Sequence, residues 1–338
     1  MDIIRFIKDW TLPVAMGTGA ALYLLFAFTP QLEEAATALG PFFATILPLF
    51  MFLILFVTFC KVDFRQLRPV AWHGWVALFQ VLFIGVLMAF LLTVEGGGLN
   101  VEGGGLNVEG GGLRVEGGGL KVLMEALLMC CISPCATAAA VVTQKLGGSL
   151  EQMTTYTFLS NFLTVLLAPI CFPLIEKGAD ITFMAAFTKI LHEVFLVLVV
   201  PMLLAYVVKH YMKGLHRRIV SVRDLSYYLW ACSLMIVTGT TVKNIVHAEV
   251  SVWLLTAIAL LGLIICVVQF AVGRFIGHYF DHAQEAGQAL GQKNTAFAIW
   301  LSSAYLNPLS SVGPGCYILW QNIVNSVEIW KHRRGVGC

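Results

Sequence analysis

A chain of 338 residues in which 59% are hydrophobic and only 12% are charged is too apolar for a soluble domain, where about a quarter of residues carry charge. The mean hydropathy of +0.83 therefore predicts an integral membrane protein. The net charge of +2 gives no reason to expect a nucleic-acid partner, and nine cysteines scattered through apolar stretches favour packing roles over a disulfide framework.

Ten stretches have the length and composition of membrane-spanning helices, which need about 20 mostly apolar residues. In chain order they cover residues 12–30, 41–60, 70–92, 122–144, 152–175, 185–208, 225–242, 251–273, 284–304 and 309–328. Basic residues concentrate in the loops after the even-numbered spans and near both ends of the chain, so the positive-inside rule predicts that both termini are cytoplasmic. We expect a multi-pass protein of the plasma or inner membrane, surrounded by the lipid bilayer.

A tandem repeat separates the third span from the fourth. The heptad at residues 94–100 recurs from positions 101, 108 and 115, and the four units contain 12 of the 31 glycines. Such a segment cannot recover its ordering entropy through packing. We expect residues 94–121 to form a mobile external loop, with a ligand- or partner-binding surface as the alternative.

Two of the spans contain residues that do not suit a continuous helix. In the fourth, Ser133 and Pro134 interrupt a helical stretch, because proline removes a backbone donor and disfavours helix at the residue before it. In the ninth, Gly287, Gly291 and the polar residues 292–294 stand where Leu and Val are usual. Interruptions at equivalent places in two halves of five spans indicate an inverted-repeat secondary transporter. Simple kinks are the alternative.

Lys293 is the only formally charged residue between Glu285 and Glu328. A charge at membrane depth costs about 2.5–3.5 kcal/mol on insertion scales, so it is a candidate functional residue. Acidic residues lie near the ends of their spans, which leaves Lys293 without an evident carboxylate partner at the same depth. The alternative is a lysine that extends to the cytoplasmic interface.

Several motifs, in order and spacing, resemble the bile acid:sodium symporter family over nearly the whole chain. They are residues 51–65, Gln80, and residues 137–141, 166–169 and 291–294. The resemblance implies an all-α fold of ten transmembrane helices in two inverted five-helix repeats, with discontinuous helices 4 and 9 crossing at their unwound centres. It implies a panel subdomain from about residues 12–60 and 185–242, and a core subdomain from about 70–175 and 251–328. Two sodium ions would lie behind the crossing, and an organic anion would bind between the subdomains.

The chain departs from this family where sodium would bind. The family usually has Ser-Asn where this chain has Ala139 and Ala140, and Glu-x-Gly-x-Gln-Asn where this chain has residues 289–294, so that Lys293 replaces the glutamine. Sodium needs oxygen ligands, whereas an ammonium supplies hydrogen-bond donors and a positive charge. We expect no cofactor and the loss of at least one sodium site, and by the same argument of both. The expected substrate- and ion-binding residues are Gln80, Pro134, Thr137, Ala139, Ala140, Thr157, Ser160, Asn161, Gln292, Lys293, Asn294, Thr295 and Asn322.

Two roles for Lys293 remain open. In the first role, its ammonium permanently replaces sodium. In the second, burial disfavours its charged form, so that its protonation couples transport to protons. The expected function is secondary active transport of a small organic anion by alternating access, since half-helix N-termini suit a carboxylate or sulfate. The alternative is a substrate-binding sensor or an uncoupled facilitator of the same fold. An intramembrane enzyme is disfavoured because no span contains Asp or a deep His, and the eight histidines do not have metal-ligand spacing.

Overall fold

The computed structural model describes residues 10–95, 119–175, 182–246 and 251–335, and within these ranges it contains helices and connecting segments but no strand. The expected all-helical class is therefore confirmed. The α-helices are α2 (Thr11–Phe28), α3 (Glu33–Lys61), α4 (Ala71–Glu95), α5 (Gly119–Ile132), α6 (Ala139–Lys145), α7 (Leu150–Ile175), α8 (Phe183–Val194), α9 (Val200–Tyr211), α10 (Lys213–Ser221), α11 (Leu225–Val246), α12 (Val252–His278), α13 (Ala283–Gly291), α14 (Thr295–Tyr305) and α15 (Val312–Arg333). The short turns are η1 (Pro30–Leu32), η2 (Phe64–Gln66), η3 (Phe195–Val199) and η4 (Pro308–Ser311).

Six helices in the described part of the chain are long and apolar enough to cross a membrane: α2, α4, α7, the α8–α9 segment, α11 and α12. Large apolar side chains cover their outer faces; on α4, for example, Leu82 is 60% and Val86 is 66% exposed. Apolar surface of this extent suits lipid chains, because water would make it an aggregation site.

Four of the ten expected spans fall outside this set of six. The second lies in α3, whose apolar part is the shorter helix Ile46–Lys61. The fourth and ninth are each divided into two short helices, with breaks at residues 133–138 and 292–294. The tenth corresponds to α15, which carries buried polar side chains on its inner face. Both interruptions that the sequence predicts are therefore present, while the number of membrane crossings remains a prediction.

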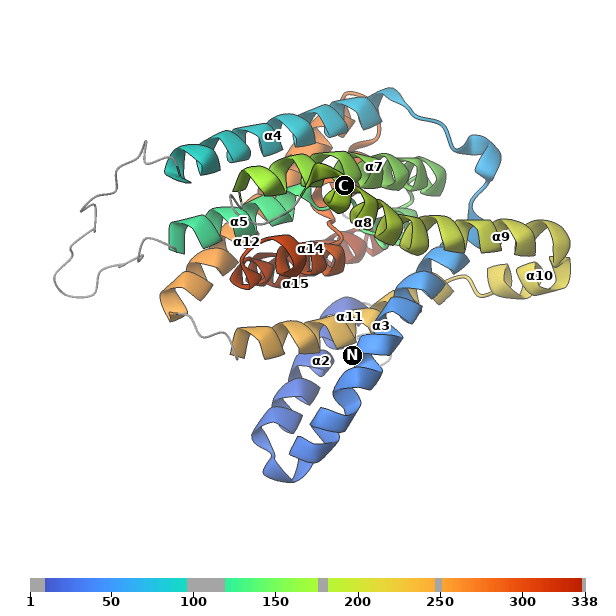
Figure 1. Ribbon diagram of the computed structural model, residues 1–338. Helices are drawn as coiled ribbons and strands as arrows, with labels where there is room; N and C mark the ends of the chain where they lie inside the picture. The colour runs from blue at the N-terminus through green and yellow to red at the C-terminus, as the bar shows by residue number, and fades with distance from the viewer. Residues whose placement is uncertain (1–9, 96–118, 176–181, 247–250, 336–338) are drawn as a thin grey trace.

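The helices pack in two groups (Figure 1). In one group, α2 and α3 lie against α11. In the other, α12 lies against α13 and α15, and α4, α5, α7 and α14 pack with them. Glycines permit the closest approaches in each group. A Cβ atom at Gly19 would overlap the backbone oxygen of Met235 on α11, and one at Gly273 would overlap the backbone oxygen of Ala286 on α13. The segment from α8 to α9 contacts both groups, since α8 packs on α7 and α9 packs on α3.

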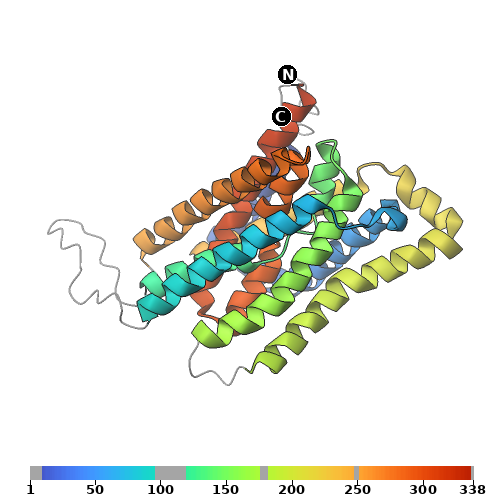
Figure 2. The same ribbon diagram turned by 90° about the horizontal axis from the view of Figure 1, so that it is seen from above.

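The α8–α9 segment contains one wide turn and ends in a sharp bend. Phe195–Val199 forms a π-helical turn just before Pro201, which lacks the N–H that would continue regular helical bonding. After Tyr211 the chain turns, and α10 runs across the end of α9 (Figure 2). α10 packs against α3 and α9.

Most of the glycine-rich repeat, residues 96–118, lies outside the described residues. The expected mobile loop therefore remains a prediction. The edges of the repeat differ from the expectation. Val94 and Glu95 belong to α4, and α5 begins at Gly119 rather than after residue 121. Both neighbouring helices therefore extend into the ends of the repeat.

Candidate functional site

The two interrupted helices meet where their backbones are unwound. Ala136 N donates to Gln292 O at 2.8 Å, and Asn294 N donates to Pro134 O at 2.8 Å. This short antiparallel pairing places one break directly against the other. Each break thereby supplies hydrogen-bond partners that the other break lost, which buried backbone in a membrane requires.

Lys293 extends from the second break to the end of α5. The residue is 1% exposed, and its Nζ donates to Cys131 O at 3.2 Å. Gln80 Nε2 donates to the same carbonyl at 3.1 Å. A helix C-terminus carries partial negative charge, so a cation is favourable at this point. The burial excludes the alternative in which Lys293 extends to the membrane interface.

Side chains of two further helices bind the carbonyls at the end of α5, and neither is among the residues expected from the sequence. Gln269 Nε2 donates to Cys130 O at 3.3 Å, and Thr164 Oγ1 donates to Ile132 O at 2.8 Å. Each of the last three carbonyls of α5 thus accepts a hydrogen bond from another element. Gln269 could have been noticed as a single amide in the apolar helix α12, and Thr164 because it follows Ser160 by one turn.

Within the described residues, no carboxylate pairs with Lys293. Glu125 accepts from Ser310 Oγ, and Glu328 forms an ion pair with Arg274. The positive charge of Lys293 is therefore balanced by carbonyl dipoles and not by an acid.

α15 holds the second break in place. Gln321 Oε1 accepts from Lys293 N at 2.8 Å, and Gln321 Nε2 donates to Lys293 O at 3.2 Å. Tyr317 OH donates to Gly291 O at 2.7 Å. Neither Gln321 nor Tyr317 was predicted from the sequence, although Gln321 is the neighbour of the expected residue Asn322.

A cleft of about 480 Å³, counting the part open to solvent, lies between the crossing and the pair α3–α11. Its wall on α3 and α11 is mostly apolar, while its wall at the crossing is mostly polar. Asn294 caps α14 by accepting from Phe297 N at 3.2 Å, so the first turn of this helix adjoins the cleft through Thr295 and Ala296. The expected residues that line the cleft are Thr137, Gln292, Lys293, Asn294, Thr295 and Asn322.

The remaining expected residues lie behind the crossing. Ser160 Oγ accepts from Cys135 N at 2.8 Å, so it contacts the first break directly. Thr157 Oγ1 donates to Met153 O, and Asn161 Nδ2 donates to Thr157 O, so both side chains bond within α7. Ser160 thus contacts the backbone of the first break, and the Thr157 side chain lies within hydrogen-bonding reach of the Cys135 thiol in the same break.

Ala139 and Ala140 begin α6 and are buried, with relative exposures of 0% and 3%. Their methyl groups add no polar atom at a position where the resembled family has a hydroxyl and an amide. Pro134 is also buried, and its carbonyl joins the crossing as the acceptor for Asn294 N.

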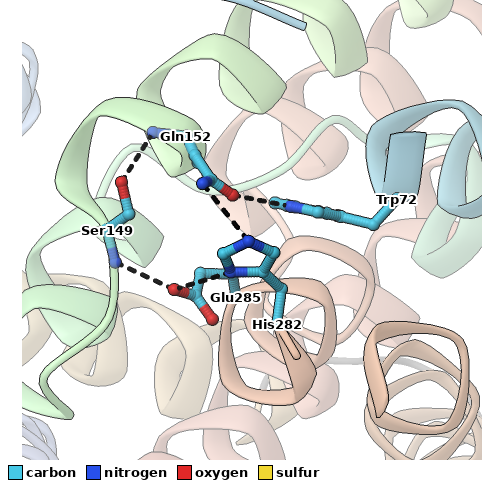
Figure 3. A network of polar contacts seen from close by, with 5 residues as sticks. All are labelled: Trp72, Ser149, Gln152, His282 and Glu285. Atoms are coloured by element: carbon cyan, nitrogen blue, oxygen red, sulfur yellow. Dashed lines mark hydrogen bonds and ion pairs between the residues drawn. The ribbon is translucent and has the colours of Figure 1, made fainter. Parts of the chain in front are cut away.

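A polar network joins α4, α7 and the start of α13 away from the crossing (Figure 3). Trp72 Nε1 donates to Gln152 Oε1 at 2.8 Å, and Gln152 Nε2 lies 3.4 Å from His282 Nε2. Glu285 accepts from Ser149 N at 2.9 Å and lies 3.5 Å from His282 Nδ1. The network connects the start of α13, which is the far end of the second interrupted helix, to α4 and to the start of α7.

Comparison with models of protein families matches residues 48–248 to the family described as the Sodium Bile acid symporter family. The match covers more than half of the chain, from within α3 to the end of α11. No curated protein matches the chain.

Proposed function

Because the chain belongs to the Sodium Bile acid symporter family, we propose that it is a ten-span secondary transporter that moves a small organic anion by alternating access. The family membership and the apolar helices make it a multi-pass integral membrane protein. The observation that carries the specific proposal is the Lys293 ammonium at the end of α5.

Lys293 fills the role of a bound cation in this proposal. Sodium is coordinated by oxygen atoms, and the carbonyls at the end of α5 are of that kind. One of them already accepts from the Lys293 ammonium and from Gln80. A second positive charge beside the ammonium would be repelled, because like charges interact strongly at low dielectric. The residues present therefore do not fit sodium at this end of α5, and transport proceeds without it.

The substrate binds in the cleft beside the crossing. Its polar wall contains amide and hydroxyl side chains and adjoins the N-terminus of the eleven-residue helix α14. Helix N-termini favour anions, and this wall carries no carboxylate. The apolar wall of α3 and α11 suits the organic part of the molecule. A rocking motion of the core subdomain against the panel subdomain would open this cleft to each side in turn.

The proposal is tested first by a thermal-shift screen of carboxylates and sulfates on the purified protein. Anions that raise the Tm are then loaded into proteoliposomes, and counterflow is measured with sodium and proton gradients imposed separately. We expect counterflow that is independent of the sodium gradient. Uptake that strictly requires sodium would overturn the assignment of Lys293.

The sensor or facilitator alternative gives a different result in the same experiment. A sensor would show a Tm shift with no counterflow. A facilitator would show counterflow that neither gradient drives uphill. The loss of the sodium ligands favours these outcomes over a sodium symporter, and the separate gradients distinguish them from proton coupling.

A further inference from the structure

α10 is a nine-residue helix with two chemically different sides. His216 and Ile219, one turn apart, are partly buried against the protein. Leu215 and Val220 flank this contact face and are 42% and 38% exposed. The side away from the protein carries exposed basic residues, which are Lys213, Arg217 and Arg218.

The charge of this region is not neutralised locally. Residues 195–223 contain five Lys or Arg and no Asp or Glu. The next acid, Asp224, pairs with Lys145. Throughout the described ranges, Lys213, Arg217 and Arg218 form no ion pair with a carboxylate. Exposed cations beside exposed apolar side chains are the pattern of a helix that lies in a membrane interface.

The position of α10 agrees with such an interface. It follows α9, the end of an apolar segment long enough to span a membrane, and turns across the end of that helix (Figure 2). The positive-inside rule accounts for the sign of the charge in this loop. It does not account for the folding of the loop into an amphipathic helix with apolar residues on both flanks of its contact face.

We propose that α10 binds the headgroups of anionic phospholipids. The guanidinium groups of Arg217 and Arg218 and the ammonium of Lys213 contact headgroup phosphates, and Leu215 and Val220 contact the start of the acyl chains. Clusters of cations next to a spanning helix attract anionic lipid in this way, and the attraction decays with distance over about one Debye length.

Lipid bound at α10 would also act on the substrate cleft. His216 Nε2 lies 2.8 Å from Cys60 O, and Lys61 Nζ donates to Arg223 O at 2.8 Å. These bonds join α10 and the turn that follows it to the end of α3. Because α3 supplies the apolar cleft wall, including Ile54, a headgroup that immobilises α10 also stabilises that wall.

The test uses the purified full-length chain in detergent, titrated separately with phosphatidylglycerol and phosphatidylcholine while the Tm is measured. We expect phosphatidylglycerol alone to raise the Tm saturably, less so at high ionic strength. The double substitution Arg217→Gln/Arg218→Gln should weaken the apparent affinity about 30-fold. Arg217→Lys/Arg218→Lys should keep most of it, and Lys331→Gln/Arg334→Gln, at another exposed basic site, should leave it unchanged.

Three results would overturn the proposal. Equal shifts with both lipids would mean that the headgroup charge is irrelevant. A similar shift with inorganic phosphate would identify a site for soluble anions instead. An unchanged phosphatidylglycerol response in the Arg217→Gln/Arg218→Gln variant would place the lipid elsewhere.

Discussion

The charge of Lys293 is tolerated because of its position relative to a single helix end. An ionised amine loses much of its hydration when 1% of the residue remains exposed. Three carbonyls at the end of α5 point toward surrounding donors, and the ammonium contacts one of them. The partial negative charge of the helix terminus compensates part of the desolvation cost. Lys293 therefore contributes to the hydrogen bonding that holds α5 and the second break together.

Truncation of Lys293 should create a site that accepts an external cation. Lys293→Ala removes the ammonium and leaves a void beside the Cys131 carbonyl. We expect methylammonium to raise the Tm of this variant by several degrees at saturation, since a ligand that binds only the folded state stabilises it. The measurement is thermal unfolding of the purified variant with and without methylammonium chloride, at constant ionic strength.

The wild-type protein and Lys331→Ala serve as controls for this experiment. Both keep Lys293, so neither should respond to methylammonium beyond a general salt effect. An equal response of all three proteins would contradict the assignment, because it would show that the cation acts outside the vacated position.

Composition and spacing alone indicate an individual residue where it is chemically unusual for its surroundings, whereas residues such as Ser160 and Gln80 are expected only through the family resemblance. Lys293 was evident from the sequence as a single charge in a long apolar stretch. Gln321 bonds to the crossing and Gln269 to the end of α5, but an amide in a spanning helix is less costly and more common than a charge. Their roles depend on which backbone groups lie opposite, and sequence spacing does not contain that information.

At the scale of elements, breaks in helices were easier to predict than contacts between them. Pro134 predicts an interruption because it removes a donor, and the unwound segment does begin beside it. The pairing of Pro134 with Asn294 joins residues far apart in the chain, and no local pattern specifies it. The same is true of Gly19 and Met235, whose close approach sets the distance between α2 and α11.

Two glycines of α2 provide a matched test of this helix contact. Gly19→Ala would force a Cβ against the backbone of Met235, which cannot move as a side chain can. A Cβ atom at Gly17 would have no neighbouring atom within 4 Å. Alanine gains about 1 kcal/mol of helix propensity at either site, whereas overpacking costs about 1–3 kcal/mol at Gly19 alone.

We therefore expect Gly19→Ala to lower the Tm in detergent and Gly17→Ala to leave it unchanged or raise it slightly. Equal effects of the two substitutions would show that α2 and α11 are not in close contact. A fall for Gly17→Ala alone would indicate that lipid or detergent packing on the outer face is the stronger constraint.

At the scale of the whole molecule, the sequence predicts subdomains, repeats and an orientation in the membrane that the packing of the helices does not by itself establish. Composition and periodicity give the helices, and the family membership gives the transporter class. The division into panel and core subdomains, the inverted repeats and the side of the membrane on which each loop lies remain predictions. Helix packing by itself does not separate a panel from a core subdomain, because the α8–α9 segment contacts both groups of helices.

The orientation is tested with cysteines introduced one at a time in a Cys232→Ser/Cys338→Ser background, since Cys232 is the exposed cysteine among the described residues and Cys338 ends the chain. Gln31 in η1 and Arg65 in η2 are both exposed and lie at opposite ends of α3. A membrane-impermeant maleimide should label Gln31→Cys in intact cells and Arg65→Cys only after permeabilisation. Labelling of both in intact cells, or the reverse order, would contradict cytoplasmic termini.

The central claim is that Lys293 takes the place of a coupling cation, and sodium binding is its most direct measure. Purified wild-type protein is titrated with sodium chloride and, at the same ionic strength, with choline chloride, while the Tm is recorded. The ammonium at the end of α5 predicts that the two curves coincide. A saturable rise in Tm that is specific for sodium would contradict the claim, because it would require a cation site that Lys293 neither fills nor repels.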